Sequence, residues 1–524
     1  MTVELDGESL TPEDVVRVAR EDATVVVSED ARERVRRSRE RVEEVLDADE
    51  VVYGLNTGFG DLVDVRIPRE ELEALQRNLI RSHAAGAGRE LEREEVRVMM
   101  ITRVNALVKG YSGVREVVID HLVTMLDEGI HPVVRSRGSL GASGDLAPLA
   151  HMSLVLLGEG EADVDGVDAR LGGTEALDSA GLEPLTLAPK EGLALINGTQ
   201  LVVGLAALCV HDAERAVRAA DVAGALTTEV TMGTTASCDP AIAAVRPHPG
   251  QATSARNVRR LTRGSEIVES HRNCDRVQDA YSIRCLPQVH GAVREGVDHL
   301  RETVEIELNS ATDNPLIFGD SEVDERASGP ESVGVLSGGN FHAEGLALKL
   351  DYLTAAMTEL ATIAERRVDR LLNPNVQEPH LPPFLTEKSG VQSGYMLAQY
   401  TAAALVNESR SLGRPSTDNT PVSGNQEDHV SMGAQSAFNA RRAVSNAVTA
   451  VGIELCCGAQ AAEFVDDELA HGRGTGAAYR VMRDVIPPLV RDRPIHVDVD
   501  AAARLVQEGV LERAVSDALD EPLE

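Results

Sequence analysis

The sequence has no tryptophan, only 2% aromatic residues and only four lysines, and these shortages exclude one broad class of function. Proteins that bind nucleic acid electrostatically present stripes of lysine and arginine, often with interleaved aromatic side chains. Here 85 acidic residues outnumber 51 basic ones, which gives a formal net charge of −34 at pH 7. We therefore predict no nucleic-acid partner.

Long apolar runs and cysteine motifs are also missing. The longest apolar run, Leu201–Val210, is too short to cross a bilayer, which takes about 20 residues. The first residues, Met1–Asp6, carry acids where a secretory signal needs basic residues. The six cysteines form no C-x-x-C pair and are too sparse for a disulfide framework. These features predict a cytoplasmic protein without a membrane partner.

The acidic excess would make a compact chain repel itself unless salt screens its charges. At about 1 M salt the Debye length falls to ~3 Å, so exposed charges hardly interact. The acids recur along most of the chain, whereas an acidic protein that docks on a basic partner would concentrate them in one block. The composition therefore predicts a protein of a high-salt, halophilic cytoplasm.

Helical patterns dominate the sequence, whereas strand patterns are sparse. A helix start is predicted at Thr11–Asp14, where a capping threonine precedes a proline and two acids. Apolar residues recur at helical spacing over 346–371 and over 437–455, and each set describes one buried stripe on a long helix. The alanines at 402–404 allow helices to approach closely, and Val25–Val27 is a short strand candidate.

These patterns predict a mainly α protein whose long helices form a bundle. The length of 524 residues permits two to four domains or one long shared core. We expect a division before the long helices begin, with residues 1–200 as an N-terminal domain and residues 201–524 as a helical-bundle domain.

The most informative segment is residues 138–151, which read GSLGASGDLAPLAH. Because Gly144 lacks a Cβ, its backbone nitrogen can approach the carbonyl carbon of Ala142 at a distance that other residues forbid. Closing this ring and eliminating the Ser143 hydroxyl would release two waters and leave an electron-poor exocyclic methylene. Such an electrophile adds a chemistry that natural side chains, which are nucleophiles or acids, do not supply.

Other motifs do not explain the segment. A nucleophile elbow needs glycine at the position of Asp145, and a dinucleotide fingerprint needs G-x-G-x-x-G, whereas Gly138, Gly141 and Gly144 are spaced three apart. No G-K-[ST] follows to form a phosphate loop. The remaining alternatives are an autocatalytic ring or an ordinary Gly/Ser-rich surface loop.

The fourteen-residue string resembles the signature of the aromatic amino acid ammonia-lyase family, whose 4-methylideneimidazol-5-one (MIO) group forms from the protein's own Ala-Ser-Gly. The resemblance implies that Ala142, Ser143 and Gly144 form MIO autocatalytically and that Asp145 assists. It implies a mainly α fold, a long-helix bundle of the ammonia-lyase and fumarase-like type with a smaller N-terminal MIO-bearing region. It also implies a homotetramer whose active sites take residues from three subunits.

Further segments between about residues 50 and 460 resemble the same family, and the resemblance gives their residues roles. Tyr53, in VVYGLNTGFG, and Tyr281, in VQDAYSIRC, are alternative catalytic bases. Arg284 stands three residues after Tyr281, so a helix would place both on one face, where the guanidinium could clamp a substrate carboxylate. The resemblance also assigns Asn197, Gln278 and Phe341 to substrate binding. Asn197 has a second implied role, the support of MIO.

Two positions resemble the histidine-specific members of the family. His83, in RSHAAG, stands where those members contact the substrate imidazole, and Glu427, in NQEDHVSM, is typical of them. A carboxylate paired with an imidazole is favourable in a closed site, whereas against a benzene ring it would be buried without a partner at a cost of several kcal/mol. The resemblance thus implies deamination of L-histidine to trans-urocanate and ammonia, as the first step of histidine degradation.

Several alternatives stay open at the level of sequence. The chain could act on phenylalanine or tyrosine, as a lyase or an aminomutase, or it could be a non-catalytic helical bundle. The substrate could add to MIO through its amine or through its imidazole. We expect no nucleotide cofactor, since the glycine fingerprint and the phosphate loop are missing. We also expect no metal, because the histidines in or near the matching segments form no H-E-x-x-H or other ligand spacing. These histidines are His83, His151, His271, His290, His342 and His429.

Overall fold

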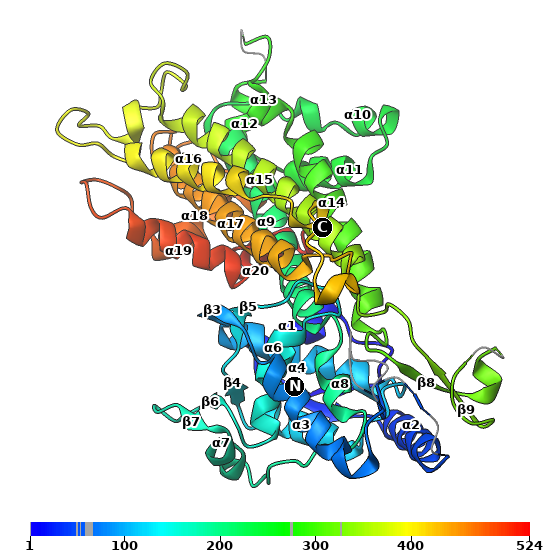
Figure 1. Ribbon diagram of the computed structural model, residues 1–524. Coiled ribbons are helices and arrows are strands. Elements are labelled where there is room, and N and C mark those ends of the chain that lie inside the picture. Colours follow the sequence, from blue (N-terminus) through cyan, green and yellow to red (C-terminus); the bar gives the residue numbers. More distant parts are fainter. Residues whose placement is uncertain (1, 49–50, 53, 58–65, 273–275, 325–326) are drawn as a thin grey trace. The chain divides into compact units, whose positions relative to one another are not determined.

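The computed structural model describes residues 2–48, 51–52, 54–57, 66–272, 276–324 and 327–524. The chain is mainly helical, as predicted (Figure 1).

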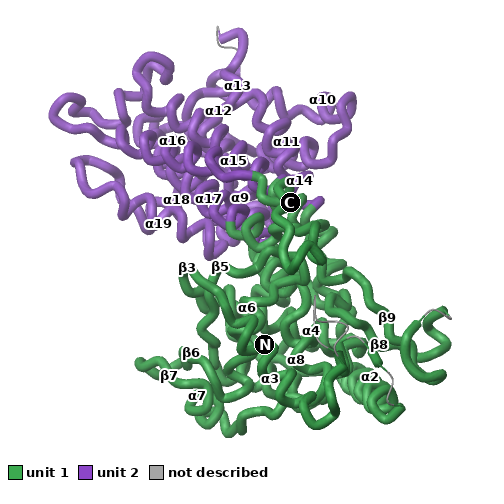
Figure 2. The backbone as a smooth tube through the Cα atoms, viewed as in Figure 1, with its two compact units in different colours: residues 1–208, 300–351, 414–438 green, residues 209–299, 352–413, 439–524 purple. Residues whose placement is uncertain are grey.

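The chain forms two compact units, each built from three segments (Figure 2). The first unit contains residues 1–208, 300–351 and 414–438, and the second contains residues 209–299, 352–413 and 439–524. The expected division was into two continuous segments at residue 200. Periodicity along a chain cannot show that the chain later returns to an earlier unit.

The first unit combines shorter helices with small sheets. Its helices are α1 (Pro12–Arg20), α2 (Glu29–Asp47), α3 (Leu72–His83), α4 (Arg93–Val108), α5 (Glu116–Asp127), α6 (Leu146–Leu156), α7 (Gly173–Ser179) and α8 (Glu191–Ile196). Its strands are β1 (Thr2–Leu5), β2 (Thr24–Val27), β3 (Ala87–Glu90), β4 (Ile130–Pro132), β5 (Arg135–Arg137), β6 (Glu161–Val164), β7 (Leu171–Gly172), β8 (Leu316–Gly319) and β9 (Val333–Leu336).

Local sequence signals explain the start of this unit. The Thr11 hydroxyl accepts a hydrogen bond from the Asp14 backbone N–H, and the Asp14 carboxylate accepts one from the Thr11 N–H, which is a capping box at the start of α1. The predicted strand at Val25–Val27 lies within β2, which pairs in parallel with β1. Both predictions are therefore confirmed.

A hydrophobic cluster joins sequence-distant parts of the first unit. Val42 and Val45 of α2 are buried together with Ile317 of β8 and Val335 of β9. β8 and β9 pair antiparallel, so the hairpin presents one apolar face to the helix. This packing brings residues 300–351 back to the N-terminal part of the chain.

Long helices dominate the rest of the chain, and the boundaries between the units fall within several of them. The remaining helices are α9 (Gln200–Val230), α10 (Pro240–Val245), α11 (Pro249–Leu261), α12 (Glu266–Ser270), α13 (Tyr281–Arg284), α14 (Leu286–Leu308), α15 (Glu344–Leu372), α16 (Met396–Ser411), α17 (Gly433–Ala462), α18 (Arg473–Val485), α19 (His496–Gln507) and α20 (Val510–Leu519). The two predicted apolar stripes lie on α15 and α17, which confirms both helices. The stripe residues are all buried: Leu346, Leu350, Leu353, Met357, Leu360, Ala364 and Leu371 on α15, and Ala437, Val444, Val448, Val451 and Leu455 on α17.

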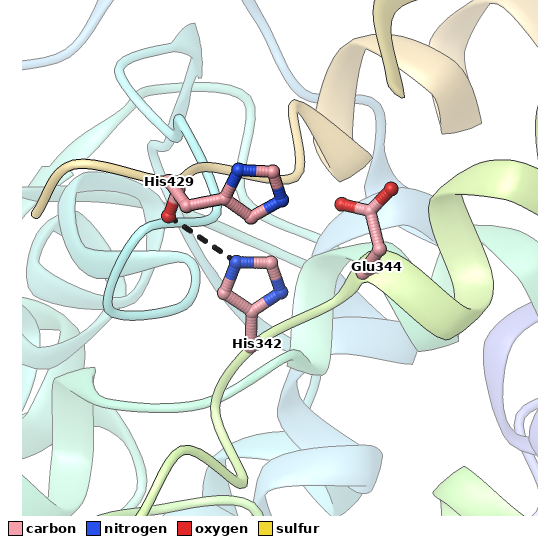
Figure 3. Close-up of side chains that lie close together, drawn as sticks. All are labelled: His342, Glu344 and His429. Carbon is pink, nitrogen blue, oxygen red and sulfur yellow. Dashed lines mark hydrogen bonds between the residues drawn. The ribbon is translucent and has the colours of Figure 1, made fainter. Parts of the chain in front are cut away.

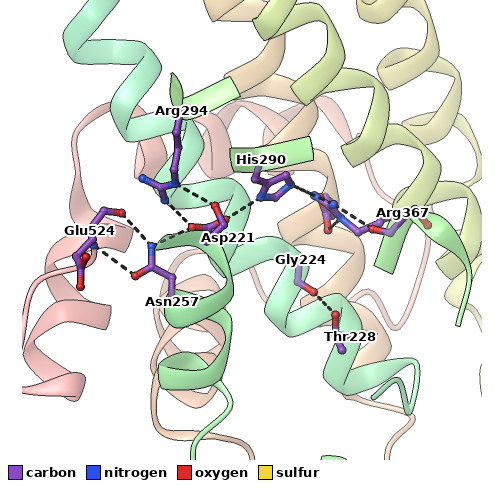
Figure 4. A network of polar contacts seen from close by, with 11 residues as sticks. Asp221, Gly224, Thr228, Asn257, His290, Arg294, Arg367 and Glu524 are labelled. Atoms are coloured by element: carbon purple, nitrogen blue, oxygen red, sulfur yellow. Dashed lines mark hydrogen bonds and ion pairs between the residues drawn. The ribbon is translucent and has the colours of Figure 1, made fainter. Parts of the chain in front are cut away.

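The second unit contains a buried polar network around Asp221 (Figure 4). Burial would raise the pKa of Asp221, but the Arg294 guanidinium and the His290 ring hold it well below its usual range. Burial lowers the pKa of His290 to about 4, so this ring is neutral at pH 7. Its Nδ1–H donates to Asp221 at 2.8 Å, and its Nε2 accepts from Arg367 at 3.3 Å. Arg367 also pairs with Glu454 at 2.5 Å, so the buried charges are paired.

No described helix combines the length and the apolar character that crossing a membrane requires. The described cysteines are free thiols, and Cys209, Cys238, Cys456 and Cys457 are buried. Cys274 lies outside the described residues.

Candidate active site

The Ala142-Ser143-Gly144 tripeptide is held against the start of α9 by a backbone contact between two glycines. Gly144 and Gly198 form a parallel β-bridge, and the Asp145 N–H donates to the Gly198 carbonyl at 2.7 Å. Gly144 has a φ of +82°, and a Cβ there would lie 2.2 Å from the Gly198 oxygen. Only glycine fits this position, which is the property that ring closure requires.

Asp145 is fully buried directly after the tripeptide. Its Oδ1 accepts from the Ser139 hydroxyl at 2.7 Å, and its Oδ2 accepts from the backbone N–H groups of Leu201 and Val202 at 2.9 and 3.1 Å. Burial raises the pKa of Asp145 to about 6, although these hydrogen bonds favour the charged form. Asp145 can therefore exchange a proton near neutral pH beside Gly144.

Ser143 lies between an amide and a carboxylate. The Asn197 side-chain N–H donates to the Ser143 carbonyl at 2.7 Å, and the Ser143 hydroxyl donates to Glu427 Oε1 at 2.8 Å. Asn197 is buried, and no described group bonds to its Oδ1. The glycine cradle, the nearby acid and this orphan amide oxygen fit an MIO ring formed from residues 142–144.

Glu427 reaches Ser143 because its segment is joined to the tripeptide segment by backbone contacts. The Met432 N–H donates to the Leu140 carbonyl at 2.8 Å, and the Ser431 hydroxyl donates to the Gly141 carbonyl at 3.3 Å. A Cβ on Gly141 would lie 2.0 Å from the Ser431 oxygen. Glycine at 141 thus permits the close approach of two segments that are far apart in sequence.

His83, at the end of α3, is oriented by the helix. Its Nδ1–H donates to the Leu79 carbonyl at 2.9 Å, which leaves the lone pair on Nε2 in the neutral ring. Burial lowers the pKa of His83, and this effect outweighs the opposing influence of the Leu79 carbonyl and of the Glu427 charge. His83 is therefore a neutral acceptor at pH 7, within the electrostatic influence of Glu427.

Two of the buried cations, Arg103 and Lys190, lie beside the segment of Asn197 and were missed by sequence reasoning. Arg103 is fully buried on α4, and its Nη1 donates to the Asn197 carbonyl at 2.9 Å and to Gln200 at 2.6 Å. Burial lowers the pKa of Arg103 to about 10. Lys190 is also fully buried and pairs with Asp313 at 2.9 Å. The sequence did contain one signal for these cations. Lysine is rare in this chain, with four in all, and one of them, Lys190, directly precedes the segment that carries Asn197.

Other predicted site residues belong to different regions. Phe341 is half-buried in the first unit. Tyr281 and Arg284 lie in the second unit on α13, where the Arg284 guanidinium carbon is 4.6 Å from the centre of the Tyr281 ring. Gln278 is exposed just before that helix. Tyr53 lies outside the described residues.

Comparisons with known proteins identify the family of the chain. Residues 10–484 match the aromatic amino acid lyase family. The chain is 63% identical to a protein of Halobacterium salinarum named "Probable histidine ammonia-lyase", over 99% of both chains. It is 47% identical to a histidine ammonia-lyase of Caldanaerobacter subterraneus, over 98% of both chains.

Solved structures show the same fold. Histidine ammonia-lyase from Trypanosoma cruzi superposes with a TM-score of 0.90 at 39% identity, covering 99% of this chain and 96% of that one. A tyrosine aminomutase from Streptomyces globisporus superposes with a TM-score of 0.92 at 37% identity over the whole of both chains. These likenesses confirm the predicted helical-bundle fold, and the chain belongs to the aromatic amino acid lyase family.

Proposed function

We propose that this protein is a histidine ammonia-lyase, a carbon–nitrogen lyase that converts L-histidine to trans-urocanate and ammonia. The observation that carries the proposal is the contact between Glu427 and Ser143, with Oε1 and Oγ 2.8 Å apart. It puts a carboxylate that can accept an imidazole N–H beside the residue from which the electrophile would form. The full-length similarity to histidine ammonia-lyases supports this substrate.

The residues around the tripeptide have complementary roles. An MIO group formed from residues 142–144 would supply an electrophilic methylene that eases loss of the substrate's amino group. Asp145 holds or releases a proton near Gly144, and the Asn197 amide binds the carbonyl of residue 143 without adding charge. Loss of the Ser143 hydroxyl would free Glu427 Oε1 to accept from the substrate imidazole. His83 would accept a hydrogen bond from the same ring through Nε2.

The family resemblance assigns the remaining roles. Arg284 binds the substrate carboxylate, and Tyr53 or Tyr281 removes the weakly acidic β-proton, a step that needs accurate positioning. Gln278 and Phe341 line the substrate site. The same resemblance supports a homotetramer with shared active sites. It leaves open whether the amine or the imidazole of the substrate adds to the electrophile.

The direct test is incubation of the purified protein in concentrated KCl with L-histidine, L-phenylalanine or L-tyrosine. Each conjugated product is followed by its near-ultraviolet absorbance, and the absence of tryptophan lowers the protein background. We expect urocanate from histidine alone. Cinnamate or coumarate would favour the phenylalanine or tyrosine alternatives. No product, together with an intact mass equal to the encoded mass, would indicate a non-catalytic bundle.

A pH profile tests the role of His83. Burial holds the pKa of His83 below the ordinary 6.5. The ring is therefore neutral above pH 6.5, and it loses the acceptor lone pair on Nε2 only at more acidic pH. We expect kcat/KM for histidine to be level near neutral pH and to fall up to ~tenfold per unit on the acid side. The substrate's own imidazole also titrates there, so the profile is compared with that of His83→Asn. An identical acid limb in both proteins would contradict the assignment.

The composition supports a halophilic, cytoplasmic protein, and its salt dependence is testable. With 85 acidic and 51 basic residues, lowering the salt from about 1 M to ~0.1 M lengthens the Debye length from ~3 to ~10 Å and strengthens repulsion among the acids. We expect Tm, followed by circular dichroism, to fall steadily as KCl is diluted. A Tm that is unchanged or higher in dilute buffer would contradict the halophilic interpretation.

A further inference from the structure

A second cluster of ligand-type side chains lies in the first unit outside the group around Ser143. His342 and Glu344 stand at the start of α15, and His429 comes from the segment that also carries Glu427. One nitrogen from each ring and one Glu344 oxygen all lie within 4.8 Å of one another. Figure 3 shows the Glu344 carboxylate on the same side of both histidine rings.

The hydrogen bond of His342 favours the form of the ring that binds metals. Its Nε2 lies 3.3 Å from the backbone carbonyl of His429, an acceptor, so Nε2 carries the proton and donates. The lone pair of the neutral ring is then on Nδ1. Metal-binding histidines commonly donate their other N–H to a carbonyl or carboxylate, because this fixes the tautomer and the ring orientation.

The two histidine rings are aligned with one another. They stack with an interplanar angle of 5° and their centres 5.7 Å apart. His429 is exposed, whereas His342 and Glu344 are half-buried, so the cluster is open to solvent on the side of His429. An ion could therefore enter without an opening of the core.

Glu344 has a carboxylate oxygen that lacks a partner. Its Oε2 is buried, and no described group forms a hydrogen bond with it. A buried carboxylate oxygen without a donor is costly, because it loses its hydration and gains no partner. A cation bound to Oε2 would remove this cost.

We propose that His342, Glu344 and His429 bind a divalent transition-metal ion of the zinc type. Two imidazoles and one carboxylate are a donor set that Zn²⁺ accepts, whereas Mg²⁺ prefers oxygen ligands alone. Zinc ligands lie about 2.0–2.2 Å from the ion, so small rotations of the three side chains would close the site. No ligand spacing of the sequence predicts this site, because the ligands come from two segments and Glu344 and His429 are 85 positions apart.

The ion would join two segments that both carry proposed substrate-binding residues. Phe341 directly precedes His342, and Glu427 stands two residues before His429. A bound ion would restrain these neighbours through the backbone. Metal binding itself is independent of the proposed lyase activity, so it can be tested without substrate.

The test is calorimetric titration of the EDTA-treated, dialysed full-length protein with Zn²⁺ in KCl. A large excess of Mg²⁺ occupies the exposed carboxylates of this acidic chain, and histidine is omitted because it chelates zinc. We expect one tight site per chain in the wild type. Loss of a ligand's hydrogen-bond partner typically weakens metal affinity ~10–100-fold. Because His342→Ala removes a ligand itself, it should weaken zinc binding by more than this.

Two further variants make the result decisive. Glu344→Gln keeps the side-chain shape but removes the charge, and it should also weaken binding at least ~10-fold. His496→Ala removes an exposed histidine of the second unit and should leave the site unchanged. Far-ultraviolet circular dichroism without zinc checks that each variant is folded. Zinc binding that is absent from the wild type, or equal in the wild type and folded His342→Ala, would overturn the proposal and leave only adventitious binding.

Discussion

Ser143→Ala is expected to lower kcat/KM for L-histidine by more than about 10³-fold, equivalent to ~4 kcal/mol of transition-state stabilisation. Alanine has no hydroxyl to eliminate, so residues 142–144 cannot produce the exocyclic methylene. The same variant should have an intact mass equal to its encoded mass. The wild type should fall short of its encoded mass by two waters. Steady-state urocanate production and intact-mass spectrometry measure the two effects separately.

Ser179→Ala is the matched control for this experiment. Ser179 ends α7, and its hydroxyl donates to the Ala176 carbonyl, so its loss removes one local hydrogen bond far along the chain from the tripeptide. We expect this control to keep both the mass deficit and the activity. Full activity in Ser143→Ala, or a wild-type mass without the deficit, would refute the MIO proposal.

Glu427→Gln is expected to reduce kcat/KM for histidine at least ~100-fold, about 2.7 kcal/mol. The imidazole would lose its charged partner in the closed site, and removing one charged partner of such a contact typically costs 2–5 kcal/mol. The amide keeps the size of the side chain, and its oxygen can still accept a hydrogen bond. What it loses is the negative charge that complements an imidazole. The measurement is kcat/KM for histidine, with any residual turnover of phenylalanine and tyrosine determined in parallel.

The neighbouring exposed residue provides the control, because Asp428→Asn changes the charge of the same segment by the same amount. It should leave the preference for histidine unchanged. If Glu427→Gln retained wild-type activity with histidine, or if Asp428→Asn lost as much, Glu427 would not be the group that recognises the imidazole. Ring formation is checked in both variants by intact mass, so a failure of maturation is not mistaken for a failure of recognition.

Parts of the fold that depend on neighbouring residues can be predicted from the sequence. The capping box of Thr11 and Asp14 and the apolar stripes of α15 and α17 depend on contacts three, four or seven residues apart. The composition of each unit cannot be predicted in this way. It depends on contacts such as those of Val42 with the β8–β9 hairpin, across more than 250 residues of sequence.

The same limit applies to the candidate site. Gly144 could be singled out because its chemistry depends on the adjacent Ala142 and Ser143. Its fit against Gly198, and the contact of Glu427 with Ser143, depend on segments whose proximity no spacing encodes. Arg103 is one of several charged residues of α4, and the sequence does not distinguish it from the others. Only the structure shows that it donates to the Asn197 carbonyl.

The glycine contact at the start of α9 has a consequence for the history of each molecule. Gly144 lies against Gly198 only when the first unit has folded, since the two residues are 54 positions apart. Water lost in forming the ring would not return when the chain later unfolds. The mass of a denatured polypeptide would therefore reveal whether that copy had once reached the native state. A preparation could be sorted into chains that matured and chains that never did, even after both have aggregated.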